Sequence, residues 1–198
     1  MPRLSTLGTA AALLLAGGAQ AADLVNIKGY GDDGAGANIY GYPVAPGSTV
    51  SLINPVMLTL AAGDYSIADA WGLPGALYDA WNFQTGAAGS WGTHYVAAEL
   101  MQDGSYQVVL DGNGPGDPTC HNHFCAWDTE EAARDAFLAA APYTIHLGHT
   151  AQLAFVSADY ALGDNAGGIS LLVSPVPEPP AALLLALGLG SMRRLRRR

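Results

Sequence analysis

The chain has 198 residues, enough for one domain and short for two, and half of them are hydrophobic. Arg3 and five arginines between 193 and 198 are set apart at the ends, so residues 22–174 carry 16 acidic side chains against two basic ones, a net charge of −14. This balance excludes nucleic acid as a partner, because phosphate binding needs clustered Lys and Arg. It suits a soluble exported protein or one that binds divalent cations.

Residues 1–21 have the pattern of a cleaved secretory signal peptide. Arg3 is the only early charge, the apolar run 7–16 is too short to span a bilayer, and small residues lead to Ala19-Gln20-Ala21. Signal peptidase is therefore an expected partner, with cleavage after Ala21. A buried N-terminal helix is the alternative.

Short runs of alternating apolar and polar residues recur between turn signals from residue 24 onward, as is typical of β-strands in a sandwich or jelly roll. Asp103-Gly104 separates two such runs and predicts a hairpin. In chain order the expected strands are 24–28, 48–53, 56–60, 65–68, 94–101, 105–110, 143–147, 151–157 and 168–173.

One helix is expected to interrupt the strands, over about residues 128–141. Asp128 is followed three residues later by Glu131, which is the spacing of a capping box with Asp128 as the N-cap. Pro142 ends the helix. The predicted fold class is therefore mainly β: a single β-sandwich or jelly-roll body over 22–174 with one short inserted helix.

Aromatic side chains are concentrated in and just after the irregular segment 69–83. Exposed aromatics beside Asp and Asn are how many carbohydrate-binding surfaces stack sugar rings. The candidate stacking residues are Trp71, Trp81 and Trp91, and the candidate polar partners are Asp69, Asp79 and Asn82. The alternative is that the tryptophans belong to the core or anchor loops, because a Trp side chain buries a large area.

The hexapeptide Cys120-His-Asn-His-Phe-Cys125 holds both cysteines of the chain. In an exported protein we expect a disulfide between Cys120 and Cys125, since the compartment is oxidising. A zinc site with His121 and His123 is the alternative, but four ligands from one tight hexapeptide would not easily form a tetrahedron.

The C-terminal segment 175–198 combines Pro177-Glu178-Pro179, an apolar run over 181–192 and a final arginine cluster. The arginines are Arg193, Arg194, Arg196, Arg197 and Arg198. This order closely resembles the PEP-CTERM sorting signal of exported bacterial surface proteins. The resemblance implies a short transmembrane helix held transiently in the inner membrane and processing by an exosortase. It also implies release to the cell surface or biofilm matrix of a Gram-negative bacterium. A permanent single-pass anchor is the alternative.

A run rich in oxygen ligands, Asp164-Asn165-Ala-Gly-Gly168, enters the last expected strand, and Asp159 lies shortly before it. Together with the Cys-His…Phe-Cys hexapeptide upstream, this run resembles the calcium loop of the soluble bacterial galactose-specific lectins. The resemblance implies calcium as a cofactor, with Asp164 and Asn165 as side-chain ligands and Asp159 as a third. An Asx-capped turn entering a strand is the alternative.

None of the five histidines lies in a Gly-x-Ser-x-Gly or His-Glu-x-x-His context. We therefore expect a non-enzymatic surface or exopolysaccharide-matrix component that binds extracellular polysaccharide with calcium. The alternative is a secreted glycoside hydrolase, since a catalytic carboxylate pair could be present among the 16 acidic residues.

Overall fold

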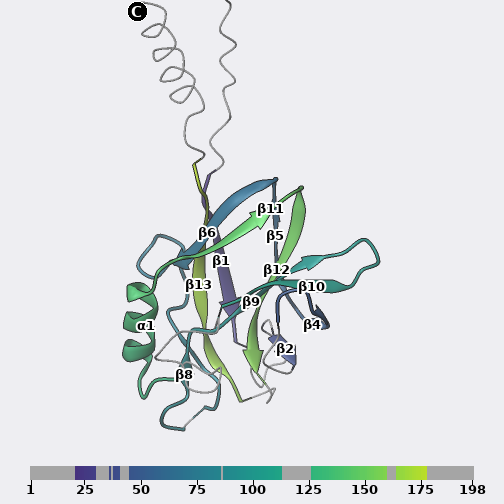
Figure 1. Cartoon of the computed structure of the whole chain (residues 1–198). Helices are drawn as coiled ribbons and strands as arrows, with labels where there is room; N and C mark the ends of the chain where they lie inside the picture. The colour runs from purple at the N-terminus through teal and green to yellow at the C-terminus, as the bar shows by residue number, and fades with distance from the viewer. Residues whose placement is uncertain are drawn as a thin grey trace, which may run out of the picture.

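The computed structural model describes residues 21–29, 36, 38–40, 45–85, 87–112, 126–159 and 164–177 (Figure 1). The expected signal peptide up to Gln20, the Cys120–Cys125 pair and the sorting segment beyond Pro177 lie outside these residues. The part of the chain that the structure describes contains no helix with the length and hydropathy that crossing a bilayer requires.

The described residues form strands and one helix, arranged as two sheets with the helix at one side (Figure 1). In chain order they are β1 (Asp23–Lys28), β2 (Asn38–Tyr40), β3 (Thr49–Val50), β4 (Leu52–Ile53), β5 (Val56–Leu60), β6 (Gly63–Asp69), β7 (Trp81–Asn82), β8 (Trp91–Gly92), β9 (Val96–Leu100), β10 (Tyr106–Asp111), α1 (Glu130–Ala139), β11 (Tyr143–Leu147), β12 (Ala151–Asp159) and β13 (Ala166–Pro175).

The first sheet is built around β13. Along one edge β13 pairs with β1, from Asp23↔Val173 to Lys28↔Gly168. Along the other it pairs with β6 and then with β7. Beyond these, β11 pairs with β6 and β8 with β7, and every pairing is antiparallel. This sheet therefore joins the first described strand to the last.

The second sheet has the strand order β3-β10-β9-β12-β2-β4, with β5 also paired to β12. β12 pairs with β9 on one edge, and on the other with β5 up to Phe155 and then with β2 from Ser157. The two outermost strands of the order, β3 and β4, are separated in sequence by Ser51 alone. The two edges of this sheet must therefore meet, so the sheet curls around on itself.

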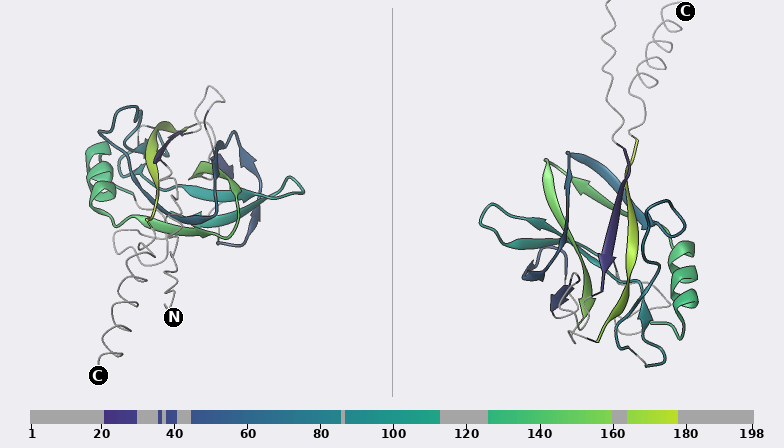
Figure 2. Two further views of the ribbon diagram at one scale, coloured as in Figure 1. Left: turned by 90° about the horizontal axis from the view of Figure 1, so that it is seen from above. Right: turned by 180° about the vertical axis from the view of Figure 1, so that it is seen from behind.

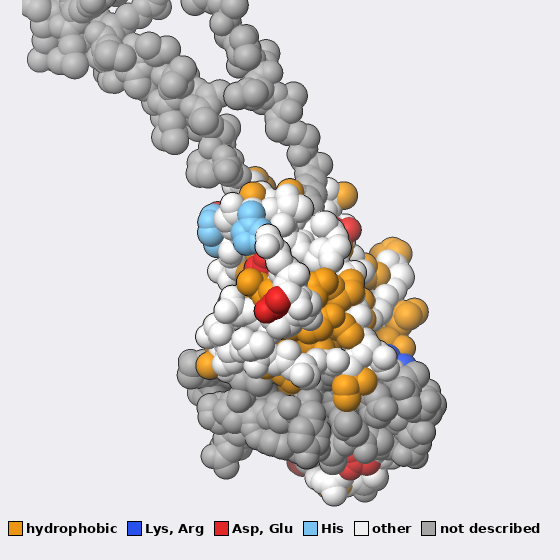
Figure 3. Space-filling model, turned by 90° about the vertical axis from the view of Figure 1, so that its right-hand side faces the viewer, with side chains coloured by type: hydrophobic (Ala, Val, Ile, Leu, Met, Phe, Trp, Pro, Cys, Tyr) orange, Lys and Arg blue, Asp and Glu red, His pale blue; other side chains and the backbone are white. Residues whose placement is uncertain are grey.

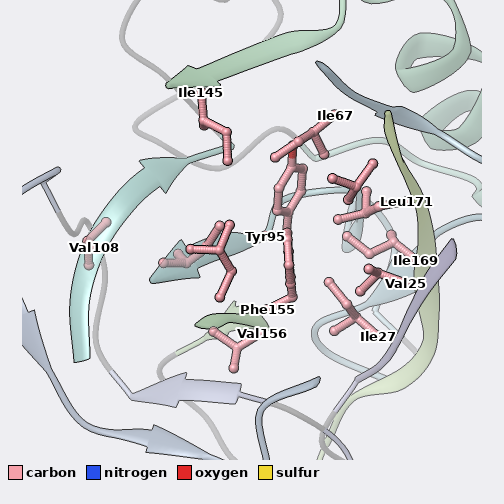
Figure 4. Close-up of a cluster of buried hydrophobic side chains, with 14 of the residues drawn as sticks. Val25, Ile27, Ile67, Tyr95, Val108, Ile145, Phe155, Val156, Ile169 and Leu171 are labelled. Atoms are coloured by element: carbon pink, nitrogen blue, oxygen red, sulfur yellow. The ribbon is translucent and has the colours of Figure 1, made fainter. Parts of the chain in front are cut away.

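β12 is buried on both faces as a consequence. All side chains from Leu153 to Ala158 are buried, although successive side chains of a strand point to opposite faces. The first sheet can cover only one of these faces, and the other lies inside the curl of its own sheet. The buried cluster draws on both sheets, with Ile27 and Leu171 from the first and Val108 and Phe155 from the second (Figure 4).

The two ends of the body lie side by side. Because β1 begins and β13 finishes in the same antiparallel pairing, the chain enters and leaves at one end of the molecule (Figures 1 and 2). At that same end, residues 61–62 and 148–150 carry the chain from one sheet to the other. The segments outside the described residues at the N- and C-terminus are thus attached at one pole of the fold.

The mainly β class with one helix is confirmed, and so is the hairpin of β9 and β10. The expected strand at 48–53 is divided, because Ser51 lies where the chain passes from one edge of the curled sheet to the other. Asn54, which follows β4, has a φ of 45°, a left-handed conformation that Asn tolerates better than most residues.

The helix is confirmed, but its predicted N-cap was wrong by one residue. α1 covers Glu130–Ala139, and Thr129 is the N-cap, with its Oγ1 accepting a hydrogen bond from the Ala132 amide at 3.1 Å. Asp128 lies outside the helix. Both residue types cap well, so the sequence alone did not separate two adjacent capping residues.

The tight approach of β1 to β13 gives a test of the fold. A Cβ added at Gly168 would overlap the carbonyl oxygen of Ile27 and lie 2.8 Å from Cγ of Tyr78. Gly168→Ala should therefore lower the free energy of unfolding by about 2 kcal/mol or more, as expected for overpacking. Gly148→Ala, where a Cβ meets nothing within 4 Å, is the matched control. Equal urea midpoints for the two variants would contradict this packing.

Candidate functional site

Residues 70–79, which form all but the last residue of the connection from β6 to β7, are fixed to the first sheet by hydrogen bonds. Asn26 of β1 donates to the carbonyl of Gly75 at 3.1 Å and accepts from the Leu77 amide at 3.1 Å. Ser170 of β13 donates to Asn26 at 2.6 Å, and its Oγ accepts from the amides of Leu77 and Tyr78. We call this segment the 70–79 loop. Its backbone is held by Asn26 and Ser170, which lie on the paired strands β1 and β13.

Two successive turns shape the 70–79 loop. The Leu73 amide donates to the carbonyl of Ala70 at 3.0 Å, and the Ala76 amide donates to that of Leu73 at 3.1 Å. Gly72 and Gly75 have φ values of 80° and 91°, a backbone conformation that residues other than Gly rarely adopt. The sequence therefore specifies this conformation locally.

Three large apolar side chains of the 70–79 loop are exposed to solvent. The exposed fractions are 41% for Trp71, 42% for Leu73 and 65% for Leu77. Scattered exposed apolar residues are common, but a group of three on one hydrogen-bonded loop is typical of a contact surface. Because the hydrogen bonds of the loop backbone are already formed, the loop presents these three side chains without first having to become ordered.

Carboxyl groups lie at the base of the 70–79 loop. Asp69 Oδ1 accepts from the Trp71 amide at 2.8 Å, and Asp79 Oδ1 accepts from the Ala80 amide at 3.0 Å. Glu130, the first residue of α1, lies close enough to Asp79 for the Asp79 side chain to contribute to the raised pKa of Glu130.

The pKa values of Glu130 and Asp69 are both raised. Desolvation, followed by the hydrogen bond to Asp79, raises the pKa of Glu130 to about 6. Burial raises the pKa of Asp69. Asp69 Oδ2 is buried and has no hydrogen-bond partner among the described residues.

Arg134 supplies the positive charge nearest to this group. Its guanidinium lies 3.9 Å from Asp79 Oδ2 but 2.9 Å from Asp135, which is more exposed. Lys28 and Arg134 are the two Lys or Arg residues of the described ranges. One shared arginine leaves the base of the loop with a surplus of acidic groups.

The three tryptophans predicted to bind sugar are not brought together on one surface. Trp81 is wholly buried, with its ring 4.4 Å from that of His94 and its Nε1 donating to the His94 carbonyl at 3.2 Å. Its prediction as a stacking residue was wrong, because it has no exposed ring face. Trp91 is partly buried and pairs through its backbone with Trp127. Of the three, Trp71 is the exposed one.

The predicted polar partners divide in the same way. Asn82 is buried and accepts from the Gln84 amide and the Ser90 hydroxyl, both at 3.0 Å, so its role is structural. Asp69 and Asp79 lie at the two ends of the 70–79 loop, where Asp69 accepts from the Trp71 amide and Asp79 from the Ala80 amide. Glu130 was not predicted as part of this group. It is 51 residues from Asp79 in sequence, and only the three-dimensional fold brings the two together.

Asp164 and Asn165, the predicted calcium ligands, are held next to each other at the start of β13. The Asp164 carbonyl accepts from both the amide and the hydroxyl of Thr85, at 2.8 and 2.5 Å. Asp164 Oδ1 and Asn165 Oδ1 are buried without a hydrogen-bond partner in the described residues, which is costly unless a cation or another donor meets them. The side chain of Asp159 lies outside the described part.

Elsewhere the described residues offer weaker candidates. They contain no group of three or more His, Cys, Asp and Glu side chains placed to hold a metal ion. His146 pairs with Asp64 at 2.6 Å and His149 with Glu99 at 2.7 Å. Histidine side chains lie at the end where the termini leave, above a band of hydrophobic side chains (Figure 3). A shallow groove runs between residues 49–52 and 104–106 and is lined by no charged group.

No protein-family model, curated protein or solved structure matches the chain.

His94, which packs against Trp81 and Phe83, should make the free energy of unfolding depend on pH. Its Nε2 lies 2.6 Å from the Ala158 carbonyl, and burial lowers its pKa from 6.5 to about 4. The unfolded chain therefore binds more protons below pH 6.5. The free energy of unfolding should fall by about 3 kcal/mol as the pH drops from 7 to 4.

The variant His94→Gln, which keeps a donor for that carbonyl, is the control. Between about pH 6 and 4.5 the raised pKa of Glu130 increases the free energy of unfolding as the pH falls. It does so in both proteins, so the difference between their free energies of unfolding isolates the effect of His94. Urea denaturation at several pH values gives the two curves. If the free energies of unfolding of the two proteins changed with pH in parallel, His94 would not be buried in its neutral form.

Proposed function

We propose that this chain is an exported, non-enzymatic surface protein whose body binds extracellular polysaccharide through the 70–79 loop. The observation that carries this proposal is the exposed Trp71, whose backbone amide is held by Asp69 in a loop that is hydrogen-bonded to the first sheet. An indole face gives a sugar ring a flat apolar surface.

The rigidity of the loop supports the same function. A surface that is ordered before binding loses less conformational entropy when a ligand arrives. Asn26 and Ser170 hold the backbone on either side of Leu77, and two turns hold it around Leu73. We place the body in the β-sandwich or jelly-roll class, in a form whose second sheet curls on itself.

The proposed route to the surface follows the resemblance of the C-terminal segment to a PEP-CTERM signal. A signal peptidase would release the N-terminus near Ala22, and an exosortase would process the chain near Pro177-Glu178-Pro179 after a transient stay in the inner membrane. The common position of the two ends in the fold supports this arrangement, since one pole would face the membrane and the rest would extend away from it.

Calcium is proposed to bind Asp164 and Asn165. Their two side-chain oxygens, which have no hydrogen-bond partner among the described residues, support this, because calcium prefers carboxylate and amide oxygens. Bound calcium would neutralise charge in a body of net charge −14 and fix the start of β13.

A glycan-binding screen of the exported protein tests the function. We expect binding to at least one bacterial polysaccharide, and Trp71→Ala should weaken it about tenfold or more, as for loss of a stacking aromatic. Met57→Ala is the matched control, since Met57 of β5 is exposed to a similar extent, 43%. Parallel screens in calcium and in EDTA test the metal. Failure to bind any polysaccharide in either buffer would overturn the proposed function.

Mass spectrometry of the surface-associated protein tests the sorting route. The expected N-terminus lies near Ala22, and the expected C-terminus lies near Glu178, without the arginine cluster. Replacing Pro177 and Pro179 with Ala should leave the cluster attached and keep the protein in the membrane fraction. An intact Arg198 in the protein recovered from the cell surface would exclude exosortase processing.

A further inference from the structure

We propose that the polymer recognised at the 70–79 loop is an uncharged β-1,4-linked glucan, which binds through the apolar faces of its sugar rings. This inference rests on the proposed function and narrows it from polysaccharides in general to one chemical class. It joins two features: the side chains that the loop exposes, and the bonding of the charged groups around it.

The exposed part of the 70–79 loop carries no charged side chain. It consists of residues 71–75, with the sequence Trp-Gly-Leu-Pro-Gly, and of Leu77. The indole N–H of Trp71 is the one side-chain hydrogen-bonding group of these six residues. A ligand of this surface must therefore gain most of its binding free energy from apolar contact.

The surroundings of the loop disfavour an anionic polymer. Residues 70–79 contain no Lys or Arg. The guanidinium of Arg134, beside Asp79, already donates from Nε and Nη2 to Asp135 Oδ1, at 3.0 and 2.9 Å. Uronate, sulfate or phosphate groups would be repelled by a body of net charge −14, with no cation on the loop to pair with them.

The loop also gives a cationic polymer no carboxylate to pair with. Asp79 is its one carboxyl group; the side chain is only 13% exposed, and Oδ1 accepts from the Ala80 amide. Asp69 precedes the loop; its Oδ1 accepts from the Trp71 amide, and its Oδ2 is buried. A cationic polymer would therefore be attracted to the acidic body as a whole, with no ion pair to hold it at this loop.

Sugar rings with equatorial hydroxyl groups fit such a surface. In a β-1,4-linked glucan the hydroxyl groups point outward around each ring, and C–H groups cover both of its faces. These faces pack on an indole and on leucine side chains by apolar contact. Because the groups in contact are uncharged, the strength of binding should not depend on salt.

The test compares three hexasaccharides that share a β-1,4-linked backbone and differ in charge: the hexamers of glucose, glucosamine and glucuronate. Calorimetry with the exported protein at pH 6 should show equal affinity for the glucose hexamer at low and high salt. Trp71→Ala should weaken this binding about tenfold or more. The glucuronate hexamer should not bind. Any binding of the glucosamine hexamer should disappear at high salt and be unchanged by Trp71→Ala.

A matched pair of variants locates the contact. Leu73→Asp places a charge on the loop and should weaken binding of the glucose hexamer about tenfold. Met57→Asp makes an equivalent change on β5 and should leave the affinity unchanged, since Met57 is 43% exposed and Leu73 42%. An equal loss of affinity in the two variants would overturn the inference, because the effect would then come from added charge at any position.

The remaining outcomes separate this inference from the proposed function. Trp71-dependent binding of the glucosamine or glucuronate hexamer at high salt, or of the glucuronate hexamer in calcium alone, would overturn the inference and leave the proposed function standing. The same follows if the glucose hexamer does not bind but another polysaccharide binds in a Trp71-dependent manner. Trp71-dependent binding of phosphatidylcholine vesicles, with no saccharide bound, would overturn both.

Discussion

The pairing of β1 with β13 is the interaction on which the rest of the structure depends. It joins segments about 145 residues apart and brings Asn26 and Ser170 into contact at 2.6 Å. From that contact the hydrogen bonds extend into the 70–79 loop, so the strand pairing also sets the position of Trp71. Gly168 lets Ile27 and Tyr78 approach the same strand closely. The pairing that closes the first sheet therefore also shapes the exposed loop.

Acidic groups that would repel one another in solution are held together at the base of this loop. Arg134, whose guanidinium lies 3.9 Å from Asp79 Oδ2, reduces this repulsion. The helix α1 contributes Glu130 and, one turn later, Arg134 to this group, and it packs Phe137 against the core. The helix thus acts as a support for the loop, and its sequence position gives no sign of that role.

Local patterns predicted much of the fold, because the alternation of apolar residues and the Asp-Gly turn act over short distances. The β9–β10 hairpin and α1 are examples. Features that depend on the whole fold were not accessible: the curl of the second sheet that divides 48–53, and the contact of Glu130 with Asp79. Trp81 and Trp71 show the same limit. The two lie ten residues apart in aromatic segments, and only strand pairing decides that one is buried and the other exposed.

The position of β13 also determines when the first sheet can form, because three other strands pair with β13. β13, at the centre of the first sheet, is the last strand of the described residues to be synthesised. A chain that crosses a membrane N-terminus first cannot complete its core until residues up to Pro175 have emerged, because β1, β6 and β7 all await the same partner. Pairing over such a separation is slow, since a long loop must close before any contact forms. On the proposed export route, the first sheet would therefore close only after β13 has crossed the membrane.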